Sequence, residues 1–102
     1  MKNIKQLQTD ILKWAGDRQI TTEGSVIGQS QKLVEEACET LTAIVRGDRR
    51  EAIDGIGDTM VVCIILAQMM NEPLEFCLEQ AYNEIKDRKG KMINGIFHKD
   101  ID

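Results

Sequence analysis

Proline and aromatic residues are scarce in this chain. It has one proline in 102 residues, and aromatic residues make up 4% of the sequence. Strands are typically rich in aromatic residues and are bounded by turn residues such as proline. The scarcity therefore favours helices over a strand-rich sandwich, and the length is that of one domain. We predict a single all-α domain over residues 1–102, in which residues 89–102 form an irregular basic tail.

Positive charge is also in short supply. The chain has 13 Lys and Arg against 17 Asp and Glu, for a net charge of −4 at pH 7. Passive binding to a nucleic-acid backbone requires a basic surface. We therefore expect no nucleic-acid partner, whereas the acidic balance is compatible with binding a cation.

The sequence shows no close cysteine pair, no signal-peptide pattern in its first residues and no long apolar run. Cys38, Cys63 and Cys77 form no CxxC motif, so we interpret them as small apolar residues in a reducing cytosol. The first ten residues lack the apolar segment of a signal peptide. The apolar run at residues 60–70 is shorter than the roughly 20 residues that span a bilayer. We expect a cytoplasmic protein without a membrane partner.

Histidine occurs once, as His98 in the tail. A zinc hydrolase, a Ser-His-Asp triad and a ferritin-like di-iron bundle all use histidine and are therefore excluded. There is also no Walker A loop and no GxGxxG motif. A bound metal would have oxygen ligands, which suit Mg²⁺, Ca²⁺ or Mn²⁺. The phosphate chemistry that remains is metal-assisted displacement by water.

What the sequence does contain is helical periodicity. Apolar spacing predicts helices at about 3–18, 29–46 and 48–70, and a fourth helix that has Pro73 in its first turn and reaches Ile85. We predict that residues 21–28, TTEGSVIG, form a loop. Short connections between successive helices indicate an antiparallel bundle of about four helices.

Strong end signals separate the second and third predicted helices. Gly47 stands where a C′ glycine belongs. Asp48 is the expected N-cap of the third helix, with Glu51 at the spacing of a capping box. From residue 59 to 70 this helix has only two polar residues, Thr59 and Gln68. A helix that is apolar all round is buried all round, so we predict a homodimer, or a dimer of dimers, with this helix at its centre.

The second predicted helix carries a charged sector about 60° wide. The sector contains Lys32, Glu36, Glu39 and Ala43. An apolar arc lies roughly opposite and comprises Leu33, Val34, Ala37, Cys38, Leu41, Ile44 and Val45. Charged residues opposite a core face are usually solvated, so this helix alone indicates a solvated face.

The third predicted helix favours a bound cation. Glu51, Asp54 and Asp58 fall on one stripe, which continues through the apolar residues Val62 and Ile65. Acids at the end of a buried face repel one another and lose hydration, and a cation removes both costs. The alternatives are that Glu51 completes the capping box and that the aspartates favour the helix N-terminus.

Glycines interrupt the same helix. Gly55 and Gly57 each cost about 1 kcal/mol inside a helix. Close approach by another helix or by a ligand would explain them, and a looser first turn is the alternative.

Three stretches resemble parts of a known family, whose pattern is Glu-Glu-x-x-Glu on one helix and Glu-x-x-Asp on the next. Residues 35–39, EEACE, fit the first half and follow the typical Lys32-Leu33 pair. Residues 14–18, WAGDR, and 57–62, GDTMVV, resemble the family's first helix and its apolar helix. Over about residues 8–70 the chain resembles the MazG-like nucleoside triphosphate pyrophosphohydrolases. The basic segment KDRKGKM resembles small phage-type members.

One departure concerns the second half of the pattern. Alignment on Gly57-Asp58 puts Gly55 where the family has Glu, whereas a literal reading gives Glu51-Ala-Ile-Asp54. Either Glu51 and Asp54 supply the missing ligand one turn earlier, or the metal site has fewer ligands than in relatives.

The resemblance implies an all-α enzyme that hydrolyses NTPs or dNTPs to the monophosphate and pyrophosphate with Mg²⁺, or with Mn²⁺. It implies that a carboxylate, Glu35 or Glu36, takes the proton of the attacking water. The implied metal ligands are Glu36, Glu39, Glu51, Asp54 and Asp58. The candidate substrate contacts are Lys32, Trp14, Lys86, Arg88, Lys89 and Lys91. For Trp14 the alternative is a core position, and for the four C-terminal cations it is a solvated basic end.

Two other functions remain open. Phosphoribosyl-ATP pyrophosphohydrolase is a relative with the same reaction type, although nothing in the sequence selects its substrate. A catalytically inactive, dimeric helical binding module is the alternative from a different class, and Gly55 is its best support.

Overall fold

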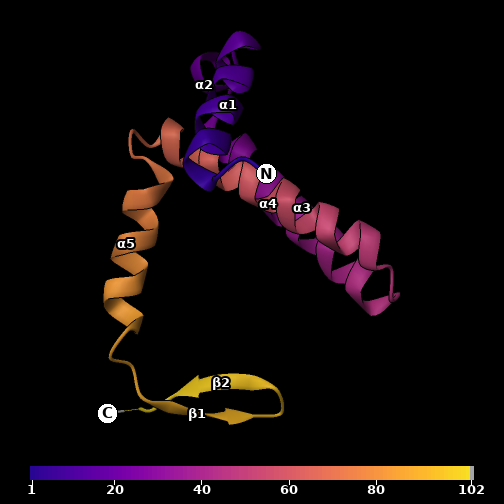
Figure 1. Ribbon diagram of the computed structural model, residues 1–102, viewed down its shortest axis with the longest axis vertical. Helices are drawn as coiled ribbons and strands as arrows, with labels where there is room; N and C mark the ends of the chain where they lie inside the picture. Colours follow the sequence, from indigo (N-terminus) through magenta and orange to yellow (C-terminus); the bar gives the residue numbers. More distant parts are fainter. Residues whose placement is uncertain (102) are drawn as a thin grey trace.

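The computed structural model describes residues 1–101 and is mostly helical, with 70% of the chain in helices. The helices are α1 (Ile4–Asp17), α2 (Ile20–Glu23), α3 (Val26–Val45), α4 (Arg49–Met69) and α5 (Leu74–Ile85) (Figure 1). They are followed by a hairpin of two antiparallel strands, β1 (Gly90–Ile93) and β2 (Ile96–Lys99). The all-α prediction therefore holds broadly, with the hairpin as an addition.

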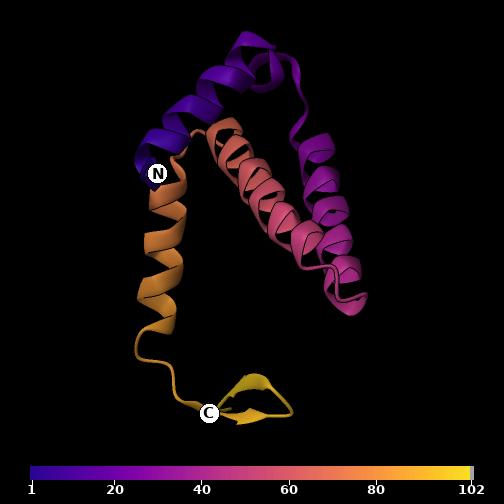
Figure 2. The same ribbon diagram turned by 45° about the vertical axis from the view of Figure 1, so that its right-hand side comes forward.

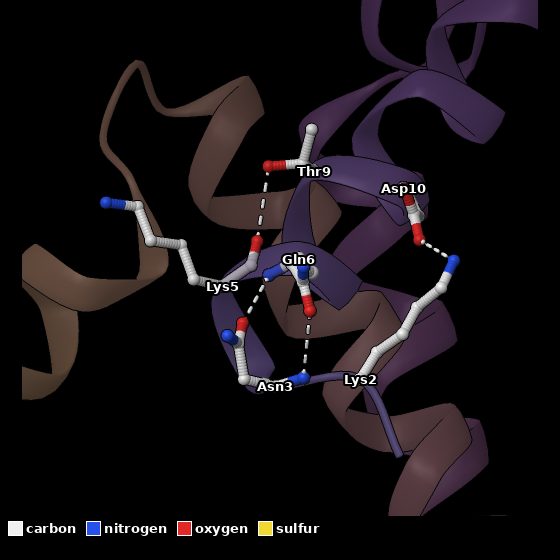
Figure 3. Close-up of polar contacts among 6 residues, drawn as sticks. All are labelled: Lys2, Asn3, Lys5, Gln6, Thr9 and Asp10. Carbon is white, nitrogen blue, oxygen red and sulfur yellow. Dashed lines mark hydrogen bonds and ion pairs between the residues drawn. The ribbon is translucent and has the colours of Figure 1, made fainter.

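Capping residues fix several of the helix boundaries. At the start of α1, Asn3 and Gln6 form a reciprocal capping box, and Lys2 pairs with Asp10 (Figure 3). Gly47 has a φ of +73°, as expected of a C′ glycine. The Asp48 carboxylate accepts a hydrogen bond of 3.1 Å from the backbone N–H of Glu51, which confirms the predicted N-cap of α4.

The prediction that residues 21–28 form a loop is wrong for most of this segment. Residues 20–23 form the short helix α2, and α3 begins at Val26. The hydroxyl of Ser25 accepts a hydrogen bond from the backbone N–H of Gly28, so Ser25 is the N-cap of α3. A serine N-cap allows the helix to start earlier than the glycine at its third position suggests.

The prediction of an irregular tail is also wrong, because residues 90–99 form the hairpin. Asn94 and Gly95 have φ values of +50° and +81°, as a two-residue type I′ turn requires. Asn-Gly between apolar pairs is the strongest short-range hairpin signal, and the sequence interpretation missed it. Met92 pairs with Phe97, and Ile93 pairs with Ile96 across the strands.

The helices form an arch and not a closed bundle. α3 and α4 lie side by side and antiparallel, and α1 crosses the end of α4 (Figures 1 and 2). α5 leaves the end of α4 and diverges from the α3–α4 pair (Figure 2). Within residues 1–101, α4 is the only element that α5 packs against. The predicted bundle of about four helices is therefore not closed within one chain.

The core is small and centred on α4. The buried apolar side chains are Ala15, Ala43, Val62, Ile64, Ile65 and Ala67. Large apolar residues on α3 are instead exposed, among them Val34, Leu41, Ile44 and Val45, at 58–77%. The apolar arc of α3 is thus not the face that packs within the chain, which corrects the sequence interpretation.

α4 also has the length and composition of a membrane-crossing helix. Its 21 residues include an 18-residue window with a mean hydropathy of 1.6, of which 28% is buried in the chain. The core helix of a soluble protein meets the same criteria. The exposed part of this helix, like the arc on α3, has no cover within residues 1–101.

All three cysteines are free thiols, as the sequence predicts. Cys38 and Cys77 are exposed, and Cys63 lies partly buried on α4. Burial raises the pKa of the Cys63 thiol, with a smaller contribution from Cys77. Cys63 therefore stays protonated near neutral pH and behaves as a small apolar residue.

Candidate functional site

The candidate site lies where α3 and α4 pack closely. Gly55 is buried on α4, and a Cβ atom added there would collide with the hydroxyl of Thr40 and lie 3.1 Å from its Cβ. The Thr40 hydroxyl donates a hydrogen bond of 2.8 Å to the backbone carbonyl of Glu36, so it stays close to its own helix. Ala43, one turn further along α3, is also buried. Small residues thus bring the helices together next to the acids, which confirms the close approach expected at Gly55.

This packing predicts opposite effects for two neighbouring glycines. We expect Gly55→Ala to lower the free energy of unfolding by about 1–3 kcal/mol, because the new methyl group overpacks against Thr40. A Cβ at Gly57 would meet nothing within 4 Å. Gly57→Ala is the matched control and should raise stability by about 0.5–1 kcal/mol. Urea unfolding of the two variants measures both, and equal effects would contradict the close packing.

Glu36 points from the charged sector of α3 toward α4. Its side chain is only 13% exposed, and Lys32 Nζ lies 3.8 Å from its carboxylate. Burial raises the pKa of Glu36, and the neighbouring carboxylates of Glu39 and Asp58 raise it further, against the opposing effect of Lys32. Glu36 is therefore turned inward and not solvated as that helix alone indicates, whereas Lys32 and Glu39 of the same sector are exposed.

The acids of α4 fall on two sides of Gly55. Glu51 borders a hollow of about 360 Å³ that Glu39 and Ala43 of α3 also line. Asp54 instead borders a groove of about 500 Å³ together with Leu7 and other residues of α1. A helix turns about 100° per residue, so Glu51, Gly55 and Asp58 share the line that faces α3. Glu51 thus borders a hollow with Glu39 of α3, whereas Asp54 borders one with Asp58 and another with Glu51.

Asp58 connects the two sides. Its charge acts on Glu36, and its side chain also borders the groove between α1, α4 and α5. The rest of that groove is mostly apolar, with Ile11, Met60 and Leu78 among its lining residues. A charged acid at the edge of an apolar hollow of this size is typical of a small-molecule site.

The donor set fits a hard cation in its chemistry. Among residues 1–101, no three His, Cys, Asp or Glu side chains stand close enough together to hold a metal ion. The acids nevertheless offer only oxygen atoms, which Mg²⁺ prefers. Their single ion pair in the described chain is the long one between Lys32 and Glu36. A divalent cation would offset the mutual repulsion that adds to the effect of burial in raising the pKa of Glu36.

The remaining candidate residues are exposed or lie apart from these acids. Glu35 is exposed on α3, although its charge also raises the pKa of Glu36. Trp14 is 46% exposed, and the guanidinium of Arg18 stacks 4.5 Å from the centre of its ring, so it occupies no core position. Of the four C-terminal cations, Lys86, Arg88 and Lys89 lie between α5 and β1, and Lys91 lies in β1. Within one chain they do not meet the acids of α3 and α4 (Figure 1).

Comparison with known proteins identifies a family. The pattern of the MazG nucleotide pyrophosphohydrolase domain matches residues 28–94. An uncharacterized 18.2 kDa protein in the rep-hol intergenic region of Haemophilus phage HP1 (strain HP1c1) is 34% identical over 68 residues. The alignment covers 67% of this chain and 42% of that relative, so the chain spans less than half of the relative's length. No solved structure matches the chain.

Proposed function

Because the chain belongs to the MazG nucleotide pyrophosphohydrolase family, we propose that it hydrolyses NTPs or dNTPs to the monophosphate and pyrophosphate with Mg²⁺. The observation that carries this proposal is the half-buried Glu36, whose pKa is raised by burial and by the acids around it. Carboxylates brought together at a cost to the fold are a sign of a functional site. Phosphoribosyl-ATP hydrolysis has the same reaction type, but nothing in this site favours that substrate.

We assign the metal to the acids on the facing sides of α3 and α4. Glu36, Glu39 and Asp58 are the principal ligands, and Glu51 completes the set because it borders the same hollow as Glu39. Asp54 lies on the side of α1 and is the weaker candidate. When bound, Mg²⁺ neutralises phosphate charge and lowers the pKa of a coordinated water. Mn²⁺ suits the same oxygen ligands.

The chain's own residues have three further tasks in this proposal. A carboxylate that is not fully used as a metal ligand, Glu35 or Glu36, takes the proton of the attacking water. Lys32, one turn before Glu36, carries a positive charge beside the phosphates. The apolar groove beside Asp58 accommodates the nucleoside part of the substrate.

A homodimer is the proposed working unit. The exposed apolar residues on α3, together with Ile53, Ile56 and Met60 on α4, are 39–77% exposed in one chain. An apolar surface of this kind marks an interface. A second copy would bury this surface, and a dimer of dimers would bury more of it.

The first test is a substrate panel. We expect purified protein with Mg²⁺ to release pyrophosphate from at least one of the common NTPs or dNTPs, and we expect EDTA to stop the release. Phosphate release without pyrophosphate would contradict attack at the α-phosphorus.

An inactive dimeric binding module is the second candidate. Gly55 stands where the family pattern has Glu, and its packing against Thr40 leaves no room for a larger side chain. A binding module would show no turnover with any nucleotide, yet nucleotide would still raise its melting temperature.

A further inference from the structure

The β1–β2 hairpin has no support from the rest of its own chain. Neither strand packs against a helix anywhere in residues 1–101. Figures 1 and 2 both place it beyond the end of α5, at the opposite end from α4. An isolated two-stranded hairpin is marginally stable in water at best. A hairpin of defined register therefore needs a surface outside its own protomer.

Both faces of the hairpin combine apolar and basic residues. Side chains of a strand alternate between faces, so the Met92–Phe97 pair shares a face with Lys99, and the Ile93–Ile96 pair shares the other with Lys91 and His98. The four apolar side chains are 40–63% exposed. Such a hairpin suits a surface that is partly apolar and partly acidic.

The complementary charges lie on the α3–α4 pair. Glu36, Glu39, Glu51 and Asp58 lie around its facing sides, and Lys32 supplies their one ion pair within the described residues. On the hairpin side, no ion pair forms in residues 1–101 with Lys86, Arg88, Lys89, Lys91 or Lys99. The exposed apolar residues of α3, including Leu41 and Ile44, lie toward the opposite side of that helix from Glu36 and Glu39. A second copy of this chain therefore supplies the acidic part of the surface that the hairpin lacks.

We propose that the hairpin of one protomer docks on the α3–α4 face of a second copy and sets its cations, Lys89, Lys91 and Lys99, against the triphosphate bound there. The site is then composite, with carboxylates from one chain and phosphate-binding cations from the other. This inference rests on the function proposed above. It explains why the acids and the predicted phosphate contacts lie apart within one chain.

Subunit complementation tests the composite site. One variant, Glu36→Gln, loses the carboxylate and keeps the hairpin. The other, Lys89→Ala with Lys91→Ala and Lys99→Ala, loses the hairpin cations and keeps the carboxylates. Each alone should retain less than about a tenth of wild-type turnover, because the loss of one charged contact to phosphate exceeds 1.4 kcal/mol.

The mixture gives the decisive result. Co-expression of the two variants should restore about a quarter of wild-type turnover, because half of the symmetric dimers are mixed and each has one intact site. If the hairpin served its own chain, the mixed dimer would have no intact site, and turnover would stay at the level of the separate variants. That outcome, or wild-type turnover by the hairpin variant alone, would overturn the proposal.

A cross-linking experiment is independent of turnover. Protein labelled with ¹⁵N is mixed with unlabelled protein, allowed to exchange subunits and treated with a carbodiimide that joins lysine to carboxylate. We expect hairpin lysines to be joined to Glu36, Glu39 or Glu51 in peptides that carry one heavy and one light partner. Cross-links found only within one isotope would overturn trans docking. If wild-type protein hydrolyses no nucleotide while heavy–light cross-links form, the proposed function fails and the docking stands.

Discussion

Replacing Glu36 by glutamine should abolish turnover and stabilise the fold. We expect Glu36→Gln to lower kcat by about 100-fold or more, because metal-assisted charge stabilisation supplies several kcal/mol at 1.36 kcal/mol per tenfold. In EDTA near neutral pH the variant should melt at a higher temperature than the wild type. The reason is that burial, Glu39 and Asp58 raise the pKa of Glu36 and so disfavour its ionised form in the folded state.

The same pKa shift predicts how the stabilising effect of Glu36→Gln depends on pH. A carboxyl group whose pKa is raised by folding destabilises the protein above its folded-state pKa, where it is ionised in both states. The penalty disappears as the pH falls below the unfolded-state value of about 4.3. The stabilising effect of Glu36→Gln should therefore be largest near pH 7 and vanish near pH 4. Thermal melts in EDTA across this range measure it.

The effect of Mg²⁺ on the melting temperature also tests the role of Glu36. Saturating Mg²⁺ should raise the melting temperature of the wild type, because a ligand that binds the folded state stabilises it. The same addition should leave Glu36→Gln unchanged. Glu72→Gln, in the exposed link before α5, is the control and should match the wild type in turnover and in its response. An equal Mg²⁺ response of all three proteins would show that the metal binds elsewhere.

Placing a charge on the exposed arc of α3 should dissociate the dimer. Leu41 is 62% exposed in one chain, so Leu41→Glu costs little within the protomer. In a dimer that buries this arc, an unpaired carboxylate costs several kcal/mol. We expect the dissociation constant to rise at least about 100-fold, since 1.4 kcal/mol is tenfold.

Light scattering at micromolar concentration measures this effect. The wild type should have the mass of two or four chains, and Leu41→Glu that of one. Thr22→Glu adds the same charge on the exposed side of α2 and should leave the mass unchanged. A monomeric wild type, or a Leu41→Glu variant that stays dimeric, would place the interface elsewhere.

Local signals predicted the parts of the fold that depend on neighbours in sequence. The α3–α4 turn follows from Gly47 and Asp48, whose backbone conformation and hydrogen bond satisfy the helix ends. The close approach at Gly55 followed from the cost of glycine in a helix. The hairpin was equally local, and its Asn94-Gly95 signal was present but overlooked.

The orientation of α3 could not be read from its own pattern. An apolar arc indicates a face that is covered, but it does not say whether the cover is the same chain or another. Within one chain α4 packs against the small residues of α3, since Thr40 and Ala43 allow an approach that Leu41 and Ile44 would prevent. Glu36 is therefore turned inward, toward α4, although its own helix pattern indicates a solvated position.

The different surroundings of Glu51 and Asp54 also required the fold. Both lie on the stripe that the sequence identified, and only the position of α3 separates them. Glu51 shares a hollow with Glu39, whereas Asp54 faces the groove beside α1.

Isotope-labelled water tests the central claim most directly. The wild type is incubated with its best nucleoside triphosphate and Mg²⁺ in H₂¹⁸O, and the products are analysed by mass spectrometry. If carboxylates on α3 and α4 support attack of water at the α-phosphorus, one ¹⁸O atom will appear in the nucleoside monophosphate and none in the pyrophosphate. Label in pyrophosphate or in free phosphate, or no product with any nucleotide, would contradict the account.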